Sequence, residues 1–93
     1  MAEVIDNPAR ERFEMQVEGR TAFVSYRRAP GVVTLYHAEV PPELEGRGIG
    51  GELVAATLAA VRAEGSKVVP RCSFVSAYLR RHAAEYGDLL VKG

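Results

Sequence analysis

The 93-residue chain predicts a single domain of mixed α/β (α+β) class. Three observations support this prediction. Apolar residues alternate through residues 13–40, a helical apolar repeat follows a glycine-rich segment at 45–51, and a short apolar run precedes a second helical repeat. The predicted order is three strands, a helix, a fourth strand and a second helix, with residues 1–10 as a flexible start.

The first three strands are predicted to be antiparallel. Residues 12–28, RFEMQVEGRTAFVSYRR, alternate apolar and polar side chains on both sides of Glu18-Gly19, which is typical of a hairpin. A turn at Ala29–Gly31 precedes VVTLYHAEV, residues 32–40, which is rich in β-branched and aromatic residues. Pro41-Pro42 closes this third strand, because proline cannot donate to a ladder.

The second half alternates helix and strand. From Gly50, apolar residues recur at three- and four-residue spacing up to a stop at Gly65. KVVPRCSF, Lys67–Phe74, predicts a short strand, and a second helix is expected over Val75–Tyr86. Since a helical crossover separates the third and fourth strands, these two should be parallel neighbours in an otherwise antiparallel sheet.

Charge and composition narrow the function classes. Lys plus Arg equals Asp plus Glu, whereas proteins that bind polyanions usually carry a basic patch or excess, so nucleic acid is a disfavoured partner. No apolar run approaches the ~18 residues that span a bilayer; we expect no membrane association and a cytoplasmic protein. His37, Cys72 and His82 are too scattered to suggest a metal site.

EGRGIGGELVAATL, residues 45–58, contains four glycines directly before the long helix. Successive backbone N–H groups at a glycine-rich helix N-terminus form an anion site, and a pyrophosphate is the usual ligand. The segment lacks the Gly-Lys-Ser/Thr of a P-loop and fails the final spacing of the dinucleotide-binding pattern. The alternative is that these glycines only build a surface turn.

VPPELEGRGIGGELVAATL, residues 40–58, resembles motif A of the GNAT superfamily of acyl-CoA N-acetyltransferases. Gly48 and Gly50 match the two small residues of that motif, while Glu45 stands where Arg or Gln is expected. Residues of about 22–90 further resemble a subgroup of very small GNAT-like proteins. The resemblance implies a minimal GNAT fold in which the parallel strands splay apart.

The same resemblance implies that acetyl-CoA lies between residues 32–40 and 67–74 and that acetyl passes to a primary amine. It implies no metal, and the acceptor is not identified. The implied cofactor-binding residues are Val40, Gly46, Arg47, Gly48, Ile49, Gly50, Gly51, Ser73, Tyr78 and Arg81.

Three residues are candidates for catalysis. His37 and Glu39 share a strand face, and a histidine suits the deprotonation of an attacking amine. Cys72, activated by His37, is expected to be able to accept the acetyl group. The alternatives are a half-buried structural histidine and a thiol that fills space. At the level of the whole chain, the rival functions are a non-catalytic CoA-binding module and a small interaction domain.

Overall fold

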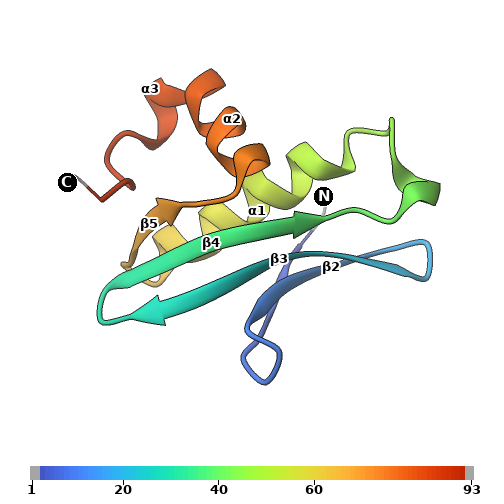
Figure 1. Cartoon of the computed structure of the whole chain (residues 1–93), viewed down its shortest axis with the longest axis horizontal. Helices are drawn as coiled ribbons and strands as arrows, with labels where there is room; N and C mark the ends of the chain where they lie inside the picture. Colours follow the sequence, from blue (N-terminus) through green and yellow to red (C-terminus); the bar gives the residue numbers. More distant parts are fainter. Residues whose placement is uncertain (1–2, 92–93) are drawn as a thin grey trace.

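Five strands form a mixed sheet in the computed structural model, which describes residues 3–91 (Figure 1). The elements are β1 (Ile5–Asn7), β2 (Arg12–Val17), β3 (Arg20–Ala29), β4 (Val32–Glu39), the 3₁₀ turn η1 (Pro42–Leu44), α1 (Ile49–Ala63), β5 (Lys67–Pro70), α2 (Ser73–Arg81) and α3 (Ala83–Tyr86). The strands lie side by side in sequence order, and only β4 and β5 are parallel. The predicted mixed, mostly antiparallel sheet with two main helices is confirmed.

Tight turns join the antiparallel strands where the sequence predicts them. Val17 pairs with Arg20, so Glu18 and Gly19 alone make the β2–β3 turn, and both have positive φ, 51° and 78°. Two consecutive residues with positive φ form the type I′ turn, whose twist matches that of the flanking strands. This confirms the predicted hairpin.

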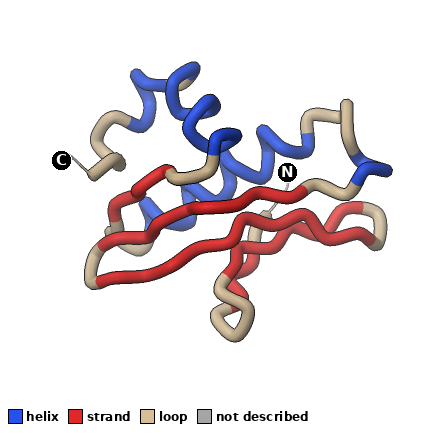
Figure 2. Tube along the Cα trace, in the orientation of Figure 1, coloured by secondary structure: helices blue, strands red, loops and turns tan. Residues whose placement is uncertain are grey.

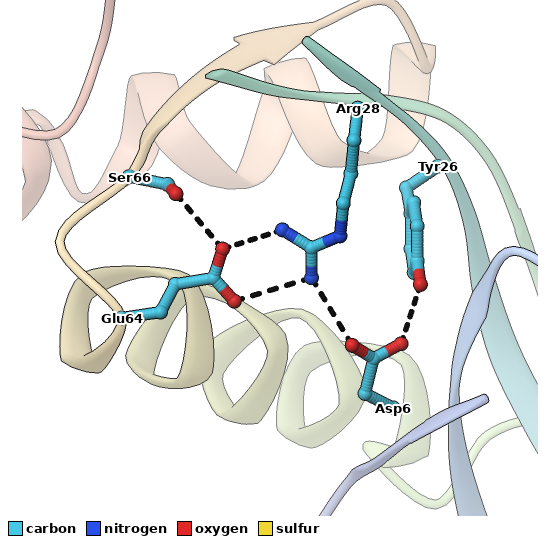
Figure 3. Close-up of polar contacts among 5 residues, drawn as sticks. All are labelled: Asp6, Tyr26, Arg28, Glu64 and Ser66. Atoms are coloured by element: carbon cyan, nitrogen blue, oxygen red, sulfur yellow. Dashed lines mark hydrogen bonds and ion pairs between the residues drawn. The ribbon is translucent and has the colours of Figure 1, made fainter. Parts of the chain in front are cut away.

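The start of the chain differs from the expected flexible segment. Ile5–Asn7 forms β1 and pairs with β2, with Asp6 opposite Phe13. The Asp6 carboxylate accepts a hydrogen bond from the Tyr26 hydroxyl at 2.5 Å and pairs with Arg28 at 3.1 Å (Figure 3). These contacts are between residues far apart in sequence, which explains why a local pattern could not predict them.

The fourth predicted strand and the second predicted helix are both wrong in their bounds. The strand expected over Lys67–Phe74 ends at Pro70, and Ser73 and Phe74 already belong to α2. The helix expected to reach Tyr86 breaks at His82, whose φ and ψ of −120° and 33° are not helical. Two shorter helices, α2 and α3, replace the single one.

The helices cover one face of the sheet (Figure 2). The residues that they bury alternate along the strands and recur along α1; they include Phe13, Met15, Ala22, Val24, Tyr26, Val33, Leu35, Leu53, Val54, Leu58 and Val61. The opposite face of the sheet carries polar and charged side chains. Within residues 3–91, no helix is both long and apolar enough to cross a bilayer.

A bulge in β4 changes which face its last residues occupy. Leu35 lies opposite Tyr26 and His37 lies opposite Ser25, so Tyr36 is an extra residue in β4. An extra residue reverses the alternation of side chains beyond it. Leu35 therefore faces the helices, His37 faces the open side of the sheet, and Ala38 faces the helices again.

Candidate functional site

The parallel strands β4 and β5 part after four residue pairs. Val32–Leu35 pairs with Lys67–Pro70, and the N–H groups of Arg71 and Cys72 then both donate to the Leu35 carbonyl, at 2.8 and 3.1 Å. Beyond this point β4 continues to Glu39 without a partner on the β5 side. The predicted splayed pair is present, with Cys72 at its vertex.

A cavity of about 420 Å³ lies beside the end of β4. The end of β4, the loop before α1, the first turn of α1 and the first turn of α2 form its walls. They contribute Ala38, Val40, Leu44, Glu45, Gly46, Gly48, Ile49, Gly50, Gly51, Leu53 and Phe74. The structure therefore gathers Val40, Gly46, Gly48, Ile49, Gly50 and Gly51 of the predicted cofactor-binding set in one wall.

The glycine segment presents an uncapped helix N-terminus to this cavity. Gly46 and Gly48 have φ of 83° and 75°, a left-handed backbone that favours glycine. Gly48 is the N-cap of α1, and no side chain accepts a hydrogen bond from the first turn. A helix begins with N–H groups that lack intrahelical partners and with a partial positive charge, which suits an anion.

Gly50 lies against Phe74 in the cavity wall. A Cβ atom there would lie only 2.7 Å from Cζ of Phe74, the far end of a side chain that is 41% exposed, so the Phe74 ring would have to shift. Glu45 is the charged side chain in the wall, so the positive potential comes from the backbone of α1 and not from a lysine or arginine.

Four of the predicted cofactor-binding residues lie outside the cavity wall. Arg47 pairs with Glu18 of the β2–β3 turn, and this contact lowers the pKa of the Glu18 carboxyl. Ser73 begins α2 and Arg81 ends it, both exposed.

Tyr78, the fourth, packs beside the first turn of α1. A Cβ atom at Gly51 would lie 4.0 Å from its ring, and the ring stacks on His82 at a centroid distance of 4.2 Å. Burial, assisted by the Tyr86 hydroxyl, raises the pKa of Tyr78. The phenol therefore stays protonated at neutral pH.

His37 and Glu39 share a strand face, as predicted. His37 Nε2 lies 3.2 Å from Glu39 Oε1, and both side chains are more than half exposed. The His37 ring lies 6.1 Å from the Phe23 ring on the open face of the sheet. The bulge at Tyr36 thus places this pair on the face opposite the cavity, with the splayed end of β4 between them.

Cys72 is the N-cap of α2 and is half-buried. No hydrogen bond joins the two members of the predicted Cys–His pair, Cys72 and His37, and the His37 ring contacts Glu39 instead. Among residues 3–91, no three metal-binding side chains are grouped.

The sequence interpretation missed Ala38, Leu44, Leu53 and Phe74 of the cavity wall. For two of them, the sequence contains a pattern that indicates a place in the wall. Ala38 alternates with Val40, and Leu53 lies one turn after the glycines.

Comparison with known proteins agrees with this geometry. A solution structure of a GCN5-like protein from Staphylococcus aureus superposes with a TM-score of 0.70 and 24% sequence identity, over 98% of this chain and 89% of that one. This likeness shows the fold. Among curated proteins, none matches the chain significantly. The family model for the GCN5-related N-acetyl-transferases matches residues 12–89, and the chain therefore belongs to this family of acyltransferase enzymes.

Proposed function

We propose that the protein binds acetyl-CoA and transfers its acetyl group to a primary amine. One observation carries the proposal: the cavity lies where β4 continues without β5 and where α1 begins with uncapped N–H groups. Such a place offers hydrogen bonds to an anion and, along the unpaired edge of β4, to an amide-containing chain. Acetyl-CoA has both parts, and acyl transfer is the family activity.

The chain's own residues divide the binding task. The N–H groups at Gly48–Gly51 hold the pyrophosphate, and the backbone of β4 beyond Leu35 pairs with the pantetheine amides. Bound acetyl-CoA supplies an activated acetyl thioester. Val40 and Phe74 contribute apolar walls that exclude water from this side of the gap.

His37 and Glu39 handle the proton of the acceptor. An amine must lose a proton to attack a thioester carbonyl, and a histidine imidazole suits the role of the base that accepts it, directly or through water. Glu39 Oε1, 3.2 Å from His37 Nε2, orients the ring. Because this pair lies on the open sheet face, the acceptor approaches from the side opposite acetyl-CoA.

Thermal unfolding during a titration with acetyl-CoA tests the binding step. A ligand that binds only the folded state adds about 2.7 kcal/mol of stability at 100 times its Kd. Adenosine, which has no phosphate, should add little. Equal stabilisation by both compounds would remove the pyrophosphate as the anchor, and no stabilisation by acetyl-CoA would support the small interaction domain.

Release of CoA thiol in the presence of primary amines tests the transfer step. Glu45 in the cavity wall departs from the family motif and favours a second candidate, a CoA-binding domain without catalysis. Binding with amine-dependent thiol release that is lost in His37→Ala supports the enzyme. Binding without any thiol release supports the second candidate.

A further inference from the structure

Two ion pairs join the β2–β3 hairpin to the segment that precedes α1, which comprises η1 and the loop after it. Glu18 of the turn binds the Arg47 guanidinium through both carboxylate oxygens. Two residues further on, Arg20 lies 3.5 Å from the Glu43 carboxylate. Each segment supplies one acidic and one basic side chain. The opposite charges therefore face each other in only one alignment of the two segments.

The two segments differ in how firmly they are held. The Gln16 amide donates to the Thr21 hydroxyl at 2.8 Å across the hairpin, next to the two-residue turn. In the loop, Leu44 and Ile49 are buried, but residues 45–48 between them are exposed. Among the described residues, the pair with Glu18 provides the only side-chain hydrogen bonds of this exposed stretch.

The exposed stretch includes the two glycines whose backbone shapes the cavity. Gly46 and Gly48 hold positive φ, and glycine loses more conformational entropy on ordering than any other residue. A ligand that binds these N–H groups must order them unless the protein has already done so. A contact from the hairpin to Arg47, which lies between the two glycines, reduces that entropic loss.

We propose that Glu18 and Arg20 are positioning residues that pre-order the glycine loop for phosphate binding. The inference rests on the proposed function, because it assigns that loop a phosphate ligand. An exposed ion pair is individually weak, and we expect its loss to lower the ratio of ordered to disordered loop by about two- to fivefold. The hairpin turn therefore tunes affinity and does not create the site.

Conformational exchange of the amides of residues 46–51, measured by NMR relaxation dispersion without ligand, tests the inference together with the Kd for acetyl-CoA. Glu18→Gln should lower the ratio of ordered to disordered loop two- to fivefold and raise the Kd by up to that factor. Arg20→Glu should act in the same direction, and adding Glu43→Arg should restore both values to within twofold. Arg10→Glu is the matched control, because it changes the net charge as Arg20→Glu does and lies in the β1–β2 loop.

Two results would overturn the inference. Unchanged exchange in Glu18→Gln would mean that the ion pairs do not order the loop. Tighter acetyl-CoA binding in Glu18→Gln would mean that Arg47 is itself a phosphate ligand that Glu18 restrains. If acetyl-CoA fails to bind the unmodified protein, the proposed function fails and with it the phosphate role of the turn, while exchange still reports whether the turn orders the loop.

Discussion

The two ends of α1 are built on opposite principles. At the C-terminal end Gly65 adopts a left-handed backbone, and the N–H of Ser66 donates to the Val61 carbonyl, so the last turn has its hydrogen bonds satisfied. At the N-terminal end Gly48 is also left-handed, but no side chain caps the first turn. The same residue type with the same backbone closes one end and leaves the other open.

The side chains around the two ends differ in the same way. Arg28 binds Glu64 through both guanidinium ends, at 2.5 and 3.2 Å, and also binds Asp6, while the Ser66 hydroxyl donates to Glu64 (Figure 3). Around the first turn of α1 the walls are glycines and apolar groups, with Glu45 as the charged side chain. Exposed backbone donors at a helix N-terminus are solvated by water unless a ligand replaces the water, so this open end, unlike the closed one, is available to an anion.

Gly48→Val and Gly65→Val form a matched pair of variants. They test whether the N-terminal end of α1 binds ligand while its C-terminal end is only structural. Both glycines have φ near 75–80° and no atom within 4 Å of an added Cβ, so the backbone strain is alike. We expect each variant to lose ~1–2 kcal/mol of unfolding free energy. Only Gly48→Val should also raise the Kd for acetyl-CoA, by about thirtyfold, because its N–H groups no longer converge on the anion.

Calorimetric unfolding and titration of the two variants give these values. Circular dichroism checks that both retain the fold. If Gly48→Val and the unmodified protein bind acetyl-CoA with equal affinity, the glycines only build a surface turn. The two ends of α1 would then not differ in function.

Arg28→Met tests how far the closed end supports the fold. The substitution keeps the aliphatic length but removes the cation shared by Asp6 and Glu64, which leaves two partly buried carboxylates with only their hydroxyl donors, Tyr26 and Ser66. We expect a loss of about 1–2 kcal/mol in chemical denaturation. Acetyl-CoA affinity should stay within twofold, and a larger change would show that the two ends are coupled.

Acidification should loosen the closed end. The hydrogen bond from Arg28 lowers the pKa of Glu64 below its ordinary value of 4.5. A carboxyl whose pKa is lower in the folded state stabilises the fold above its unfolded pKa, and this contribution disappears as the pH falls through the folded pKa. Glu64→Gln should therefore reduce the loss of stability below pH 4.5, by up to about 1 kcal/mol, in urea unfolding from pH 7 to pH 3.

A structural feature could be predicted from the sequence when it is formed by residues that are close together in the chain. The turn at Glu18-Gly19 and the helix stop at Gly65 follow from neighbouring residues and were predicted correctly. The bulge at Tyr36 depends on how β4 pairs with β3, so no pattern within residues 32–40 could reveal it. This single feature decides which face His37 occupies.

The residues of the candidate site also divide into those that a local pattern predicts and those that depend on distant contacts. Its glycine wall was predicted, because a glycine-rich turn before a helix is a local pattern. Phe74 was missed because the strand was extended past Pro70, which hid that α2 begins at Ser73 and carries Phe74 over Gly50. The contacts of Arg28 with Asp6 and Glu64 were missed because they join three separate parts of the chain, namely β1, β3 and the segment between α1 and β5.

Substitution of Cys72 is expected to have the smallest effect on stability. It tests which of two routes the acetyl group takes. The thiol is half-buried at the vertex of the splayed strands and makes no hydrogen bond to His37, whose ring pairs with Glu39 on the other face. This arrangement favours direct attack by the amine over an acetyl-cysteine. Cys72→Ala should change the unfolding free energy by less than about 1 kcal/mol and keep the transfer rate within threefold, whereas His37→Ala should lower the rate at least about a hundredfold. Intact-mass analysis after incubation with acetyl-CoA checks the route independently. An acetyl group mapped to Cys72, together with lost transfer in Cys72→Ala, would establish the covalent route. Cys72, at the vertex of the splayed strands, and His37, on the open face of the sheet, would then have to come together during turnover.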